Sequence, residues 1–409
     1  MTRRVHIVFL ARDRTLALIA LLTLVSTLAL LLGGTAVEVM SPARDAVSGR
    51  VVAIDAGHGG PDGGAVGKSG VVEKHINLHI ALELQRLLGR SAVHTVMTRT
   101  TDTDLASDGG TVTGSRKLAD LKRRAVLVNE AEPDIFISIH SNSFPEPQWS
   151  GGQVFYSLSS EEGRRLAVEI QTKLAEVLGP NSRKARPADI YLLHAVKAPS
   201  ALVEVGFLSN PREERLLSDP TYRVKVAGAI YQGIISYMTG TASTQAGESW
   251  GTVQRVSAQT QAGSDAAVLY FGGPTNMDGA LVPEVRQLPG LGSMNKTEAV
   301  GALVSALLAG PGQASILQPT VPAGVVIRSV AMSGDVAVVD FSSEFIANHW
   351  GGSAAEEMTI YSIVNTLTEL PYVKAVKILV EGQPIGALSG HLDLEHALQR
   401  NTSMVRFRS

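Results

Sequence analysis

The chain of 409 residues contains no cysteine. This absence excludes a disulfide framework and any metal site built on thiolates, so a metal ion here would need histidine and carboxylate ligands. An excess of charge of one sign is also missing, because 36 Lys and Arg residues oppose 38 Asp and Glu residues, a formal net charge of −2. We therefore expect no nucleic-acid partner. The length predicts about two to three domains.

Two common phosphate-binding motifs are missing from the glycine-rich stretch Val51–Asn77. It lacks the G-x-x-x-x-G-K-[ST] signature, and its glycine spacing is not that of a dinucleotide fingerprint. What it contains is a short apolar strand ending at Asp55, a glycine-rich loop with His58, and Glu73 at the start of a helix. A histidine and a carboxylate at the carboxyl edge of a sheet suit a metal such as zinc, so a metal site is favoured over a phosphate site.

The first 40 residues are typical of a targeting segment. Arginines at positions 3, 4, 12 and 14 flank an uncharged run, Thr15–Leu32. This pattern fits either a secretory signal or a minimal membrane span with its N-terminus inside. Ala36-Val37-Glu38 is a poor cleavage site, which favours an uncleaved anchor. We expect residues 1–48 to form a signal-anchor and short stalk, and the rest of the chain to lie outside the cytoplasm, in the cell envelope.

Strands and helices alternate over residues 49–240. The pattern predicts strands over 51–55, 94–99, 134–140, 153–157, 189–195 and 201–207, helices over 72–88, 116–132 and 161–178, and a helical region from Asn210-Pro211 to 238. This alternation predicts an α/β fold with a mostly parallel open sheet and helices on both faces. Ligands of such sheets bind beyond the carboxyl ends of the strands.

Two further polar residues lie in strands that do not need them for packing. His140 ends the strand 134–140, and Glu204 lies inside the apolar strand 201–207. A buried carboxylate is seldom left without a partner. We interpret His58, Glu73 and His140 as three zinc ligands with a fourth position for water, and Glu204 as the general base. The ordinary alternatives are a solvated loop histidine at 58 and a satisfied core histidine at 140.

His75 and His79 form a rival pair of ligands, because residues four apart share a helix face. At about 100° per residue, Glu73 lies on the apolar face that contains Ile76 and Ile80, whereas both histidines lie on the polar face. No glutamate follows His75, so there is no H-E-x-x-H motif. We expect both to be surface residues.

Short motifs follow one another along this region: Asp55-Ala-Gly-His58-Gly-Gly, Glu73-Lys-His-Ile-Asn77, Thr98-Arg99, Arg124 with Asn129, Ser138-Ile-His140-Ser-Asn142, and Ala201-Leu-Val-Glu204-Val-Gly-Phe-Leu-Ser-Asn210. With these motifs, residues 49–240 resemble the zinc-dependent N-acetylmuramoyl-L-alanine amidases of the Amidase_3 family. In that family the positions matching His58, Glu73 and His140 bind zinc, and the one matching Glu204 is catalytic.

The resemblance implies hydrolysis of the amide bond between muramic acid and the L-alanine of the stem peptide in peptidoglycan. Zinc would polarise the lactyl carbonyl and lower the pKa of a bound water toward ~7. Glu204 would take the water proton and deliver it to the departing nitrogen. Asn142 and Arg186 are candidate substrate contacts, with a purely structural role as the equal alternative.

Residues 241–264 are rich in Ser, Thr, Gln, Ala and Gly without periodicity, which predicts a flexible linker. Residues 265–400 are expected to form a smaller α+β domain, followed by a tail, 401–409. The pattern predicts strands over 267–271, 281–287, 325–331, 336–341 and 375–380, and helices over 296–308 and 353–370. Ser333-Gly334-Asp335 predicts a hairpin turn. Ser353 is expected to cap its helix, with Glu356 three residues later.

A second resemblance is carried by Leu281-Val-Pro-Glu284, Val339-Asp340-Phe-Ser-Ser-Glu344-Phe, Gly351-Gly-Ser353, Thr366-Leu-Thr-Glu369-Leu-Pro371 and Gly390-His-Leu-Asp-Leu394. These residues resemble the GerMN domain of sporulation and germination proteins. The resemblance implies a role in binding a partner or lying near peptidoglycan rather than catalysis. Asp340, Glu344 and His349 offer metal-ligand chemistry, but we interpret them as polar residues of loops and a helix start.

Together these observations predict a membrane-anchored spore-cortex amidase with a C-terminal assembly domain, acting before muramic δ-lactam formation. The expected partners are peptidoglycan, the membrane through the N-terminal helix, and a sporulation or envelope protein bound by the GerMN domain. Two alternatives stay open: a non-catalytic peptidoglycan-binding protein, for which Glu204 would have no use, and a vegetative cell-separation amidase.

Overall fold

The computed structural model describes residues 46–106, 114–179, 181–240, 265–274 and 279–406. The chain divides into two compact units, Met1–Ser48 and Gly49–Ser409. The expected anchor run Thr15–Leu32 and the expected linker 241–264 lie outside the described residues. Within the described ranges, no helix is both long enough and apolar enough to cross a membrane.

Residues 49–240, which we call the first region, are built on a six-stranded sheet with the order β2-β1-β3-β6-β4-β5. Its strands are β1 (Val51–Ala56), β2 (His94–Met97), β3 (Ile135–Asn142), β4 (Gln153–Tyr156), β5 (Arg186–Pro187) and β6 (Ser200–Phe207). Neighbouring strands are parallel, apart from the antiparallel pair β4 and β6. The expected mostly parallel sheet is therefore confirmed. All eight residues of β3 and of β6 are buried, as in a central strand covered on both faces.

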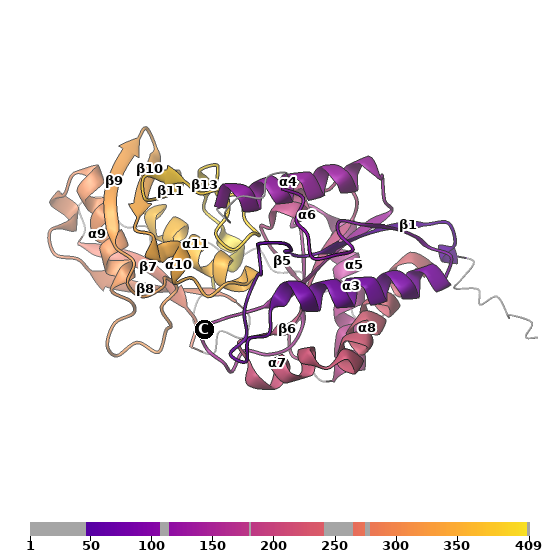
Figure 1. The fold of residues 1–409 in the computed structure, drawn as a ribbon. Coiled ribbons are helices and arrows are strands. Elements are labelled where there is room, and N and C mark those ends of the chain that lie inside the picture. The colour runs from indigo at the N-terminus through magenta and orange to yellow at the C-terminus, as the bar shows by residue number, and fades with distance from the viewer. Residues whose placement is uncertain (1–45, 107–113, 180, 241–264, 275–278, 407–409) are drawn as a thin grey trace, which may run out of the picture. The chain divides into compact units, whose positions relative to one another are not determined.

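Helices cover both faces of this sheet (Figure 1). One face packs against α3 (Glu73–Arg90) and α5 (Glu161–Leu178), with α8 (Pro220–Thr239) lying against both of these helices, and the other face packs against α4 (Gly114–Glu130) and α6 (Tyr191–Ala195). A short helix, α7 (Pro211–Ser218), precedes α8, and the Asn210 side chain caps it as expected. Helix α5 has Ser160 as its N-cap, with the side chain accepting from the Gly163 N–H.

The strand expected over residues 189–195 is wrong. The segment instead contains α6, and the short edge strand β5 precedes it. Leu192 belongs to the core beneath α4, and Leu193 belongs to the core beneath β4 and β6. Because α6 is short and buries apolar side chains on both of its sides, its sequence does not show the helical period of 3.6 residues. Such a run cannot be told from a buried strand by its pattern.

The C-terminal region, residues 265–406, has the expected α+β organisation (Figure 1). Strand β7 pairs antiparallel with β8, and a second sheet has the order β12-β11-β10-β9, with β13 also on β11. The turn at 333–335 joins β9 to β10 as an antiparallel hairpin. The elements are β7 (Ala266–Gly272), β8 (Leu281–Gln287), η1 (Leu291–Ser293), α9 (Lys296–Leu308), β9 (Ile327–Ser333), β10 (Val336–Phe341), α10 (Glu344–Ala347), α11 (Ser353–Leu367), β11 (Ala375–Val380), β12 (Gln383–Pro384), β13 (Leu398–Gln399) and η2 (Thr402–Met404).

The cap expected at the start of α11 is wrong. Gly352 occupies the N-cap position with a φ of 77°, and Ser353 is already the first helical residue. The Ser353 hydroxyl donates to Glu204 in the first region. The Glu356 carboxylate accepts from the backbone N–H groups of Leu388 and His391. Both side chains therefore have buried tertiary partners, which sequence spacing alone does not reveal.

Candidate metal centre

The four residues singled out from the sequence meet at the carboxyl edge of the sheet. His58 follows β1, Glu73 begins α3, His140 lies in β3, and Glu204 is its direct neighbour on β6. All four side chains are buried, and Glu204 is only 1% exposed. Parallel order brings these strand ends together, which is why residues far apart in the sequence converge here.

The loop that holds His58 is strained and firmly anchored. His58 has a φ of 62°, a conformation that costs a residue with a Cβ about 1–3 kcal/mol. Arg124 from α4 donates to the His58 carbonyl at 2.7 Å and to the Asp55 carboxylate at 2.6 Å. Arg99 donates to the Gly57 carbonyl at 3.0 Å. These buried guanidinium contacts keep the loop in the shape that turns His58 toward the centre.

Two distances between the expected donor atoms match the edge of a tetrahedral metal site. Glu73 Oε1 lies 3.3 Å from His58 Nε2 and 3.2 Å from His140 Nδ1. Ligand atoms at the usual zinc distance in a tetrahedron are separated from one another by about 3.3 Å. His58 Nε2 is buried and has no hydrogen-bond partner among the described residues. His58 Nδ1 lies 2.9 Å from Asp62 Oδ2, the carboxylate contact that keeps the other ring nitrogen available for a metal. The residues present therefore fit a zinc ion.

The charges of the site also favour a bound cation. Burial would lower the pKa of His58, but Glu73 and Asp62 raise it to about 10. Burial would raise the pKa of Glu73, but His58 and His140 hold it well below its usual range. The pKa of His140 is lowered to about 4, chiefly by burial. A histidine must lose its proton to bind a metal, so binding of a cation by His58 would be coupled to proton release.

Glu204 has the properties of a proton carrier. Burial and the nearby Glu73 raise the pKa of Glu204 to about 8. Its Oε1 accepts from Ser353, while Oε2 is buried and has no partner in the described parts of the chain. A carboxyl group with a pKa near neutrality beside a metal site is suited to general acid–base chemistry.

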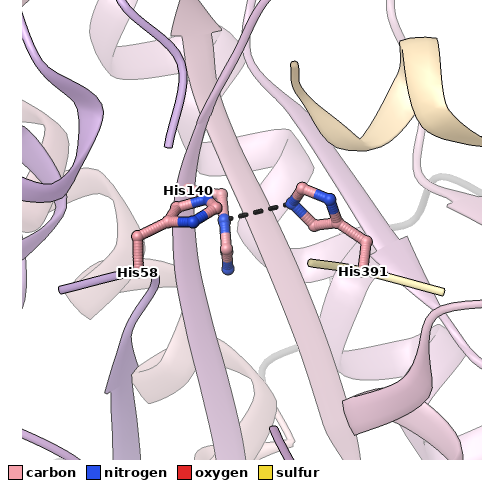
Figure 2. A group of neighbouring side chains, drawn as sticks. All are labelled: His58, His140 and His391. Carbon is pink, nitrogen blue, oxygen red and sulfur yellow. Dashed lines mark hydrogen bonds between the residues drawn. The ribbon is translucent and has the colours of Figure 1, made fainter. Parts of the chain in front are cut away.

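A third histidine, His391, lies at the same centre and had no assigned role from the sequence. Its Nε2 lies 3.4 Å from His140 Nδ1, and the donor atoms of His58, His140 and His391 all lie within 4.8 Å of one another. Figure 2 shows the three rings converging. His391 is 251 residues beyond His140, in the C-terminal region. The only sequence signal was its membership of the motif 390–394, which does not indicate a ligand.

The remaining candidates lie in other surroundings. Asn142 accepts the Ser143 N–H, and Arg186 forms a buried ion pair with Glu357 at 2.7 Å. His75 is exposed and His79 partly exposed, and neither belongs to a metal-ligand cluster of the described residues. Three residues of the C-terminal region, Asp340, Glu344 and His349, also belong to no metal-ligand cluster of the described residues.

Comparison with known proteins gives matches to both regions. A family model described as N-acetylmuramoyl-L-alanine amidase matches residues 52–236, and one described as sporulation and spore germination matches residues 268–386. The germination-specific N-acetylmuramoyl-L-alanine amidase of Bacillus subtilis is 45% identical over 194 residues, 47% of this chain and 81% of that protein. The amidase LytC of the same organism is 33% identical over 202 residues, 49% of this chain and 38% of that protein.

A solved structure is also similar to this chain. The CwlD amidase from Clostridioides difficile, in complex with the GerS lipoprotein, is 38% identical with a TM-score of 0.46. The match covers 47% of this chain and 99% of that one.

Proposed function

The chain belongs to the N-acetylmuramoyl-L-alanine amidase family, and on that premise we propose a zinc-dependent reaction with His58, Glu73 and His140 as ligands and Glu204 as general base. The bond hydrolysed joins muramic acid to the L-alanine of the peptidoglycan stem peptide. The observation that carries the proposal is the spacing of about 3.3 Å from Glu73 Oε1 to His58 Nε2 and His140 Nδ1, together with the burial of His58 Nε2, which makes no hydrogen bond among the described residues.

The chemistry divides between the metal and this chain's own residues. A bound zinc ion supplies a Lewis acid that polarises the substrate carbonyl and acidifies a water molecule. Glu204, next to His140 on β6, accepts the water proton and returns it to the leaving alanine nitrogen. Asp62 holds the His58 ring with Nε2 toward the ligands.

The setting we propose is spore-cortex remodelling outside the cytoplasm. Support comes from the match of residues 268–386 to a sporulation and germination family and from the germination-specific relative. The run Thr15–Leu32 supports attachment to the membrane by sequence alone. We keep the division into an enzyme region, 49–240, and a partner-binding region, 265–400, as part of the proposal.

Product analysis on purified peptidoglycan tests the function. Zinc-loaded protein should release new L-alanine amino termini, and Glu204→Ala should lose at least about 10²-fold of the rate. Metal analysis separates the roles, because Glu204→Ala should keep its zinc whereas His58→Ala should lose it. His75→Ala, which alters an exposed histidine of the same helix as Glu73, is the control for both measurements. Equal rates in wild type and Glu204→Ala would contradict the assignment of the base.

Comparing substrates separates the two settings. Cortex peptidoglycan should be the better substrate for a spore enzyme, whereas faster hydrolysis of vegetative peptidoglycan would favour the cell-separation amidase.

A further inference from the structure

The catalytic groups of the first region are covered by the C-terminal region. The Ser353 hydroxyl at the start of α11 donates to the Glu204 carboxylate, and His391 Nε2 lies 3.4 Å from His140 Nδ1. The Glu204 residue is only 1% exposed to solvent and His140 only 4%. A glycan strand with its stem peptides cannot reach side chains buried to this extent.

His391 is held in the manner of a metal ligand. Its Nδ1 lies 2.8 Å from Glu356 Oε2, which repeats the contact of His58 with Asp62. The backbone N–H of His391 donates to the same carboxylate, and its carbonyl accepts from the Tyr191 N–H of the first region at 2.8 Å. A carboxylate on one ring nitrogen fixes the other as the ligand atom. The distance of 3.4 Å from His391 to His140 is also close to the edge of a tetrahedral zinc site, about 3.3 Å.

The surface around His391 is closely fitted. All fifteen residues of α11 are buried. Arg186 of the first region pairs with Glu357 of α11 at 2.7 Å, both side chains being almost inaccessible. A Cβ on Gly352 would lie 2.6 Å from both Asn142 Oδ1 and Ser143 N, so only glycine permits this approach. Paired buried charges and a glycine-dependent contact are features of a specific interface.

We propose that the C-terminal region holds the enzyme latent, with His391 as the fourth zinc ligand and Ser353 bound to the general base. The inference rests on the function proposed above. His391 then takes the coordination position that the reacting water needs, and Ser353 occupies one oxygen of the carboxylate that must accept the water's proton. Activity requires the C-terminal region to leave the site, and its departure breaks the contact from His391 to the metal. The wild type therefore releases L-alanine termini only through the fraction of molecules in which the C-terminal region has left.

A cavity beside the centre reaches one proposed metal ligand, His58, but not the general base. It has a volume of about 740 Å³ and is lined by His58 and Lys117 from the first region and by Ile346 and Leu388 from the C-terminal region. Of the described residues that line it, none is Glu73, His140 or Glu204. A stem peptide in this cavity would therefore remain out of reach of the base.

X-ray absorption on the zinc-loaded full chain tests the ligand directly. Wild type should show three histidines and no water, and His391→Ala should show two histidines with an added water oxygen. Competition with a chelator should show zinc bound at least about 10–100-fold more weakly in the variant, and release of L-alanine termini should rise. His75→Ala removes an exposed histidine that belongs to no metal-ligand cluster of the described residues, and it should match wild type. An unchanged histidine count and zinc affinity in His391→Ala would overturn the proposal.

A second pair of variants tests the covering without touching a ligand. Gly352→Ala should force the two regions apart, giving faster amide exchange in α11 and faster release of L-alanine termini. Gly382→Ala is the matched control, because its φ of 74° is nearly that of Gly352 but no described atom would lie within 4 Å of the new Cβ. Equal effects of the two substitutions would mean that backbone strain alone is responsible. This result would contradict the proposal that the C-terminal region covers the catalytic groups.

The outcomes separate the two proposals. Three histidines on zinc in a protein from which no variant releases L-alanine termini would leave the ligand assignment standing and defeat the amidase function. Release of L-alanine termini by a wild type with only two histidines on zinc would leave the amidase function standing and defeat the assignment of His391 as a ligand.

Discussion

At the scale of single residues, the metal-binding loop depends on an ion pair that lies beneath it. Asp55 accepts hydrogen bonds from Thr98, Ser138 and Arg124, all in the interior. Arg124 also donates to the carbonyls of Ala56 and His58, and its Nε–H donates to the Asp120 carboxylate at 2.8 Å. The same pair therefore balances a buried charge and holds His58 in its strained conformation.

We expect Asp55→Asn to lower the free energy of unfolding by about 1–3 kcal/mol, because it removes one of the two carboxylates that balance the buried Arg124 charge and leaves only Asp120. The measurement is urea unfolding of the metal-free protein, read as a shift of the midpoint at constant slope. Glu161→Gln breaks an exposed pair with Arg164 and is the control, with little change expected. A midpoint for Asp55→Asn equal to that of the control would contradict this role.

The contribution of Asp55 should also depend on pH. Burial would raise the pKa of Asp55, but Arg124, His140 and the hydroxyls of Ser138 and Thr98 bring it well below its usual range. A carboxyl group whose pKa is lower in the folded state stabilises the fold above its unfolded pKa of about 4 and loses that contribution as pH falls further. The difference in free energy of unfolding between wild type and Asp55→Asn should therefore be constant between about pH 5 and about pH 7. It should shrink below about pH 4. A difference that grows on acidification would exclude this explanation.

At the scale of elements, α11 marks the limit of what the sequence could predict. The apolar pattern predicts that α11 is a helix and where it lies. The same pattern predicts β1, β3, β6 and α3, and the polar residues in these elements stand out because their neighbours are apolar. Ser353 and Glu356, however, match the spacing of a helix cap, and that local explanation concealed their tertiary partners. His391 could not be assigned because no periodicity connects it with His140.

Arg186 offers a test at this scale, because its role as a substrate contact and its role in docking α11 give different results. We expect Arg186→Met to leave Glu357 buried without its partner and to raise amide exchange throughout α11. The control is Arg165→Met, which removes an exposed pair with Glu162. A rise in KM with unchanged exchange in α11 would instead support the substrate contact.

At the scale of the whole molecule, two regions that the sequence separated by a linker form one compact unit over Gly49–Ser409. The composition of residues 241–264 predicts a boundary but says nothing about which surfaces meet beyond it. A tether alone raises the effective concentration of the two regions for each other to about the millimolar range. Contacts such as that of His391 with His140 then decide whether they remain together.

Removal of the metal should therefore affect both regions in the wild-type full chain. Zinc at about 100 times its Kd stabilises the folded state by about 2.7 kcal/mol, and ligands from both regions spread that stabilisation across their interface. We expect chelation to raise amide exchange around His58 and also in residues 385–394. In His391→Ala the effect around His58 should persist, whereas residues 385–394 should no longer respond to the metal. If residues 385–394 ignore chelation in wild type as well, zinc does not join the regions, and the interface depends only on contacts such as Arg186 with Glu357.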